Sequence, residues 1–66
     1  MKIILNGEPR EVPEGLTVSG LLAHLGIASG RVAIERNLDI LPRDKWESTQ
    51  LVTGDRFEIV HFVGGG

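Results

Sequence analysis

The C-terminal run of three glycines, residues 64–66, has the most specialised chemistry in this sequence. Glycine loses more conformational freedom on ordering than any other residue, so we expect a flexible tail behind a folded domain of residues 1–63. At about 3.3 Å per extended residue, Val63 and the three glycines can reach roughly 13 Å from the domain. A tail this thin can enter the active site of another protein and present the carboxylate of Gly66 there.

The carboxylate of Gly66 is a poor electrophile because it carries a negative charge. Joining it to AMP gives a mixed anhydride with a good leaving group, to which a partner enzyme can transfer sulfur or an amine. This route divides a difficult substitution into two easier ones. The tail is therefore a candidate substrate rather than a candidate catalyst.

Other residues that could carry chemistry are scattered along the chain. His24 and His61 have no carboxylate or nucleophile beside them in sequence, as acid–base or nucleophilic catalysis requires. The acidic residues in predicted turns lack the ligand spacing of a calcium or zinc site, and we expect them to cap turns or face solvent. They are Asp39, Asp44, Glu47 and Asp55. The glycines do not form a phosphate-binding loop. We expect no catalytic group and no metal in this chain.

Length and composition indicate a small domain held together by hydrophobic packing. A domain of 66 residues buries only about 60% of its unfolded surface, and this one has no cysteine to form a disulfide. A net charge of −2 with dispersed basic residues argues against a nucleic-acid partner. The sequence shows neither a secretion signal nor a long apolar run, so we expect a cytoplasmic protein without membrane contact.

The first half of the chain predicts a hairpin and a helix. Residues 1–5 read as a strand, Asn6-Gly7 as a tight turn, and residues 9–12, which lie between two prolines, as an edge strand. Apolar residues then recur with helical spacing across residues 18–25. Thr17 is the expected N-cap and Gly26 the expected left-handed end of this helix.

The second half predicts mainly strands. Residues 32–36 and 56–62 alternate as strands, residues 40–42 are a candidate short strand, and residues 44–49 read as a helical turn or loop. This order predicts an α+β protein with the β-grasp, or ubiquitin-like, fold: a four- to five-stranded mixed sheet with one main helix across one face. In that fold the first and last strands lie side by side and parallel.

Alternation along the last strand separates two faces. Phe57 and Ile59 share one face, while Val60 and Phe62 share the other, which the helix cannot cover. Val60 and Phe62 either form an exposed apolar surface for a partner or pack under a loop, beneath Trp46. Trp46 itself can fill the core or anchor a partner, and core filling is the favoured interpretation.

Several segments together resemble the ThiS family of sulfur carriers in thiamine thiazole synthesis. The hairpin, the central strand, the Pro-Arg-x-x-Trp segment and the glycine-ended last strand carry this resemblance, which covers essentially the whole chain. These segments are residues 6–8, 32–37, 41–46 and 54–66.

The resemblance implies a carrier rather than an enzyme. A ThiF-like adenylyltransferase would use MgATP to convert Gly66 into an acyl adenylate. Sulfur from a persulfide, supplied by a desulfurase or sulfurtransferase system, would then displace AMP and leave a thiocarboxylate. Thiazole synthase would accept that sulfur. Gly64 and Gly65 would pass into the partner active sites, and we expect Val60, Phe62 and Val63 to dock. The carrier itself would bind no cofactor.

Two other readings stay open at this point. The small subunit of molybdopterin synthase, or another ubiquitin-like sulfur carrier, would use the same chemistry with a different acceptor. A TGS-type β-grasp module, from a different functional class, would bind its partner noncovalently. Such a module has no need of a free glycine terminus.

Overall fold

The chain begins with a hairpin of two strands, β1 (Lys2–Leu5) and β2 (Glu8–Glu11), in a computed structural model that describes residues 1–62. Asn6 and Gly7 join the strands with φ angles of 49° and 82°, the left-handed values that suit a two-residue hairpin turn. β2 is exposed along its length and lies at a sheet edge, as predicted, although it is displaced by one residue from the predicted range.

Helix α1 (Val18–Leu25) begins and ends where the sequence indicates. The Thr17 hydroxyl accepts a hydrogen bond from the backbone N–H of Gly20 at 3.1 Å, and Gly26 ends the helix with a left-handed φ of 70°. The Leu16 side chain lies closest to the space that a Cβ on Gly20 would occupy, at 3.3 Å. In the part of the chain that the structure describes, no helix is long and apolar enough to cross a membrane.

The remaining elements are short and mostly extended. They are η1 (Ser29–Arg31), β3 (Val32–Arg36), β4 (Asp39–Ile40), the 3₁₀ turn η2 (Arg43–Lys45) and β5 (Arg56–His61). β4 begins one residue before the predicted range 40–42 and ends at Ile40, because the turn ahead of it is only two residues long. β5 ends one residue earlier than predicted, although the Phe62 N–H still donates to the carbonyl of Arg31.

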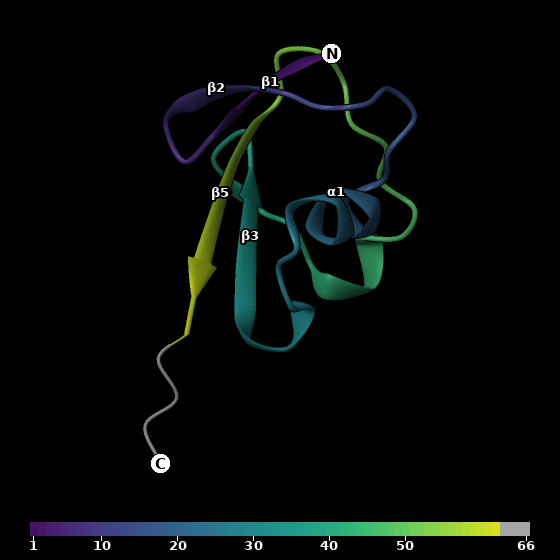
Figure 1. Cartoon of the computed structure of the whole chain (residues 1–66). Helices are drawn as coiled ribbons and strands as arrows, with labels where there is room; N and C mark the ends of the chain where they lie inside the picture. The colour runs from purple at the N-terminus through teal and green to yellow at the C-terminus, as the bar shows by residue number, and fades with distance from the viewer. Residues whose placement is uncertain (63–66) are drawn as a thin grey trace.

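The strands form one sheet in the order β2-β1-β5-β3-β4, and β1 and β5 run parallel at its centre (Figure 1). All other pairs are antiparallel. Helix α1 provides the crossover between the two halves and covers one face of the sheet. This arrangement confirms the predicted β-grasp fold, with five strands and one main helix among residues 1–62.

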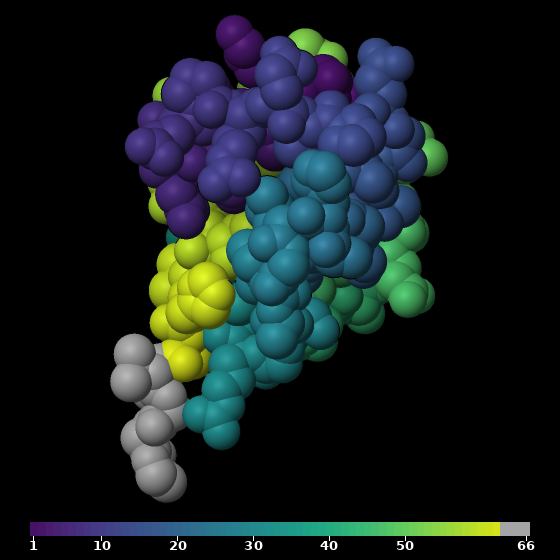
Figure 2. Space-filling view, viewed as in Figure 1, coloured from purple at the N-terminus to yellow at the C-terminus, as the bar shows by residue number. Residues whose placement is uncertain are grey.

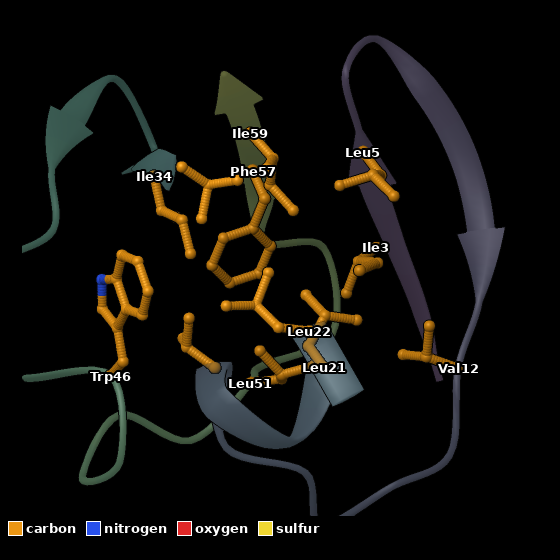
Figure 3. Packing of buried hydrophobic residues seen from close by; sticks show 12 residues of the cluster. Ile3, Leu5, Val12, Leu21, Leu22, Ile34, Trp46, Leu51, Phe57 and Ile59 are labelled. Carbon is orange, nitrogen blue, oxygen red and sulfur yellow. The ribbon is translucent and has the colours of Figure 1, made fainter. Parts of the chain in front are cut away.

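The hydrophobic core lies between α1 and the covered face of the sheet (Figure 3). Its buried residues come from every part of the described chain: Ile3, Leu5, Val12, Val18, Leu21, Leu22, Val32, Ile34, Trp46, Leu51, Phe57 and Ile59. Trp46 is only 4% exposed, and its indole N–H donates to the Leu41 carbonyl at 3.0 Å. Trp46 therefore belongs to the core, which was the favoured interpretation.

Candidate docking face and tail exit

The alternation of β5 divides its side chains between the core and the surface. Phe57 and Ile59 are 1% and 6% exposed, whereas Val60 and Phe62 are 50% and 57% exposed. Val60 and Phe62 lie outside the buried cluster that contains Trp46, so they do not pack beneath it. The space-filling view shows the end of β5, in yellow, open at the surface below the hairpin of β1 and β2 (Figure 2). The sheet therefore presents apolar side chains immediately before the tail.

The helix-free face has a like-charged pair at its centre. Pairing of β3 with β5 places Ala33 opposite Val60 and Glu35 opposite Glu58. Within residues 1–62 neither of these glutamates takes part in an ion pair. Like charges directly opposite each other on adjacent strands are destabilising. A basic group from outside would therefore be favourable at this point of the face.

A second exposed apolar pair lies in the turn between β3 and β4 and in β4 itself. Leu38 is 81% exposed and Ile40 is 75% exposed. Leu38 has a φ of +75°, which is rare for a bulky residue, and follows Asn37 at +51°. Burial of its side chain does not compensate this strain.

The side chain of Asn6 extends the sheet beyond the end of β1. Its Oδ1 accepts from the backbone N–H of Ile59 at 2.8 Å, and its Nδ2 donates to the carbonyl of the same residue at 3.4 Å. These bonds join residues that are 53 positions apart. Sequence reasoning identified Asn6 as a turn residue but missed its contact with β5, because a turn signal contains no information about a distant strand.

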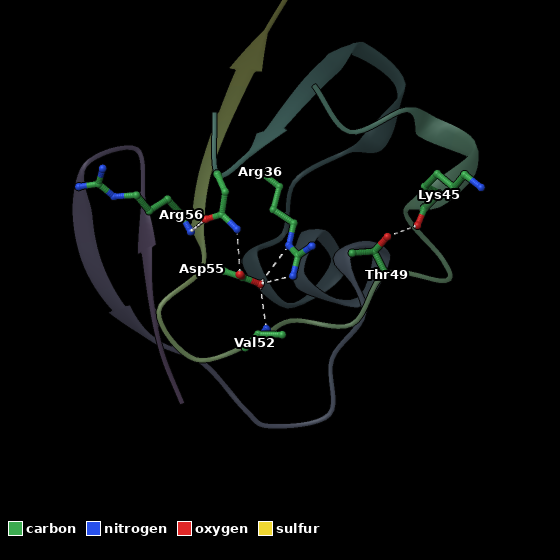
Figure 4. A network of polar contacts seen from close by, with 7 residues as sticks. Arg36, Lys45, Thr49, Val52, Asp55 and Arg56 are labelled. Atoms are coloured by element: carbon green, nitrogen blue, oxygen red, sulfur yellow. Dashed lines mark hydrogen bonds and ion pairs between the residues drawn. The ribbon is translucent and has the colours of Figure 1, made fainter. Parts of the chain in front are cut away.

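Asp55 organises the start of β5, and its burial corrects the expectation of a solvated or simple capping charge. It is 5% exposed. Its Oδ2 accepts from Arg36 Nε at 3.1 Å and from the Val52 N–H at 2.8 Å, and its Oδ1 accepts from Asn37 Nδ2 at 3.3 Å (Figure 4). Arg36 Nη2 also lies 3.1 Å from Oδ2. Because three partners surround the carboxylate, its role is structural.

Other candidate chemistry does not gather at one place. Within residues 1–62 there is no group of three histidine or acidic side chains that could hold a metal ion. A groove of about 480 Å³ lies on the opposite, helix-covered side, where Leu22, Ile27 and Trp46 contribute to its wall. The predicted tail residues Val63, Gly64, Gly65 and Gly66 lie outside the described residues.

Comparisons with known proteins agree on one family. The model of the ThiS family matches residues 3–66. A thiazole synthase of Paramagnetospirillum magneticum is 46% identical over the whole chain, which covers 20% of that protein. The sulfur carrier protein ThiS of Bacillus subtilis is 40% identical over 76% of this chain and 76% of its own length.

A solved structure has the same fold. The crystal structure of thiamine biosynthesis protein ThiS from Geobacter metallireducens superposes with a TM-score of 0.85 at 36% identity, covering 100% of both chains. The chain spans about a fifth of the length of the thiazole synthases that it matches. The family match extends over nearly the whole sequence, and the chain belongs to the ThiS family.

Proposed function

We propose that this protein is a sulfur carrier in thiamine thiazole biosynthesis, and that it is a protein co-substrate rather than an enzyme. The carboxylate of Gly66 is adenylated with release of pyrophosphate from ATP. The terminal sulfur of a persulfide then attacks the acyl carbon and displaces AMP, and a thiol cleaves the resulting acyl disulfide to leave the thiocarboxylate and a new disulfide. The thiocarboxylate sulfur is finally donated to the thiazole ring. Covalent activation makes each substitution easier than direct replacement of a carboxylate oxygen.

One observation carries this proposal: the exposed, helix-free end of β5 leads in sequence directly into Val63 and three glycines, in a chain of the ThiS family. The exposed residues Val60 and Phe62 provide a surface on which a partner can rest. The following residues have the thinnest backbone that a polypeptide can offer. The folded domain thus provides a docking surface, and the glycine tail next to it in sequence provides the substrate.

The partners follow from this chemistry. A ThiF-like adenylyltransferase supplies the nucleotide site and uses MgATP, so the carrier binds no cofactor of its own. A desulfurase or sulfurtransferase system supplies the persulfide, and the reactions take place in the cytoplasm. The whole chain is similar to a segment of two thiazole synthases, which supports thiazole synthase as the enzyme that receives the sulfur. A carrier segment and an enzyme in one polypeptide have a high effective concentration for each other.

Docking occurs through the helix-free face next to the tail. Val60, Phe62 and Val63 provide the apolar contact, and Gly64 and Gly65 pass into the active site. The facing carboxylates of Glu35 and Glu58 add a preference for a basic group on the partner.

Intact-mass spectrometry tests the chemistry at Gly66. The chain is incubated with the adenylyltransferase, MgATP, a persulfide donor and a thiol reductant, and we expect one oxygen to be replaced by sulfur. A variant lacking Gly66 and a variant with one alanine added after Gly66 should remain folded and unmodified. Modification of either variant would contradict the assignment of the terminal carboxylate.

Steady-state kinetics with the adenylyltransferase tests the docking face. The double variant Val60→Ser, Phe62→Ser should raise the KM for the carrier about tenfold with little change in kcat, since a tenfold change corresponds to about 1.4 kcal/mol of binding. Val52→Ser is the matched control, because Val52 is 56% exposed but lies in the loop before β5. Equal KM values for the double variant and the control would exclude this face.

A further inference from the structure

The backbone leaves the sheet beside a short segment, residues 29–32, which we call the exit ledge. The Phe62 N–H donates to the carbonyl of Arg31 at 2.8 Å, one residue beyond the end of β5. Val32 at the other end of the ledge pairs with His61. The ledge therefore contacts the last two described residues of the chain, His61 and Phe62.

The exit ledge has little local structure to hold it. Residues Ser29–Arg31 form a single 3₁₀ turn, and Ala28 before it makes no side-chain capping bond. Short 3₁₀ turns have poor hydrogen-bond geometry. Residues 28–31 are also exposed, so burial does not fix them. Val32, in contrast, is 2% exposed and paired in β3, so residues 29–31 are the part of the ledge that depends on contacts from elsewhere.

Arg43, the first residue of η2, provides this support. Its Nη1 donates to the carbonyl of Ser29 at 2.5 Å, and its Nη2 donates to the carbonyl of Val32 at 3.2 Å. One guanidinium thus holds both ends of the exit ledge. The guanidinium carbon Cζ lies 4.4 Å from the ring centroid of Trp46, and Trp46 is itself buried in the core. The planar fork of arginine can bridge two carbonyls in this way, whereas the single ammonium of lysine cannot reproduce the fork.

We propose that Arg43 is a positioning residue for the reaction at Gly66: by holding the exit ledge against the core, it sets the point at which the tail leaves the sheet. This inference rests on the proposed function, because it concerns delivery of the same carboxylate. A tail that starts from a variable position enters an active site less often in a reactive geometry, and small misplacements have large effects on rate. Arg43 acts through the backbone of the ledge and touches no reacting atom.

Amide hydrogen exchange tests the geometric part of the inference. Arg43→Met keeps the apolar stem over Trp46 but removes all five donors, and we expect the Phe62 N–H to exchange about tenfold faster. The Ile59 N–H, which Asn6 holds, should keep its rate. Arg43→Lys should give an intermediate rate. Lys45→Met is the control, because it removes a neighbouring exposed positive charge without touching the ledge.

Two exchange results would overturn the inference. One is an unchanged rate at Phe62 in a folded Arg43→Met protein. The other is an equal acceleration at Phe62 and Ile59, because that would indicate a general loss of stability. Neither measurement depends on sulfur chemistry, so both can be made without any partner.

Kinetics with the adenylyltransferase tests the functional part. In Arg43→Met we expect kcat to fall about fivefold to tenfold while the KM for the carrier is kept, because the docking residues Val60 and Phe62 are unchanged. Arg43→Lys should recover part of the loss, and Lys45→Met should match the unaltered protein. An unchanged kcat together with faster exchange at Phe62 would refute the positioning role. Failure of the unaltered chain to be adenylated would instead refute the proposed function.

Discussion

The two ends of β5 are held by different kinds of contact. At its start, Asp55 is buried and accepts hydrogen bonds from Arg36, Asn37 and the Val52 backbone. At its other end, Val60 and Phe62 are half-exposed and the backbone bonds to the exit ledge. One strand thus connects a buried polar network at its start to exposed apolar side chains at its end.

The start of β5 therefore contributes mainly to the stability of the fold, whereas its end is accessible to a partner protein. A buried carboxylate surrounded by donors resists movement, because breaking its contacts leaves charged and polar groups without partners. An exposed apolar residue contributes less to folding and stays free to contact another protein. We therefore expect substitutions at the start of β5 to lower the free energy of unfolding and substitutions at its end to alter partner reactions.

Removal of Asp55 should have the largest effect on stability. Asp55→Ala leaves the guanidinium of Arg36 and the backbone N–H of Val52 without their acceptor, and we expect a loss of about 3 kcal/mol in the free energy of unfolding. Urea denaturation measures this loss through the midpoint at constant slope. Asp44→Ala, at an exposed position in η2, should change the stability by less than about 0.5 kcal/mol. A loss below about 1 kcal/mol for Asp55→Ala would show that the anchor is unimportant.

A substitution at Asn6 can distinguish its role in the hairpin turn from its side-chain contact with β5. Asn6→Gly keeps the positive φ but removes both bonds to Ile59, and we expect a loss of about 1–2 kcal/mol by urea denaturation. The amide of Ile59 should also exchange faster with solvent. If Asn6 served the turn alone, glycine would be neutral or stabilising, since it reaches positive φ at lower cost. That outcome would remove the tertiary role of Asn6.

Leu38 should give the smallest effect and one of opposite sign. Leu38→Gly relieves a bulky residue at φ +75°, and only a mostly exposed side chain is lost. After allowing for the greater flexibility of glycine in the unfolded chain, we expect a gain of about 0.5–1 kcal/mol. Leu38→Ala keeps the strain and should show no gain. Thermal unfolding compares the two variants directly, and a glycine variant less stable than the alanine variant would contradict the strain.

Local patterns predicted the elements of the fold well. Thr17 and Gly26 bound the helix because capping depends on bonds within three or four residues. The alternation of Phe57 and Ile59 located the buried side of β5 for the same reason. Boundaries of short strands cannot be predicted as closely, as β4 shows, because a two-residue strand is defined by its pairing and not by its own sequence.

Long-range contacts of the candidate site were not predictable in this way. Asp55 looked like other turn acids, and its burial depends on Arg36, which lies 19 residues away. Arg43 belonged to a segment that resembled the family, but the carbonyls that it holds lie 11 and 14 positions earlier. No spacing rule connects such residues, because the intervening loops have no regular geometry.

The amino-acid sequence by itself determined the elements of this protein, the family to which it belongs, and the tail of glycines on which the proposed chemistry rests. Backbone preferences and side-chain alternation act over a few residues, so they can be read from the chain directly. Only the tertiary structure decided that Trp46 is buried, that the Asn6 side chain bonds the backbone of β5 and that Arg43 bonds two carbonyls of the exit ledge. Those contacts join distant segments, and their geometry exists only after the core has packed.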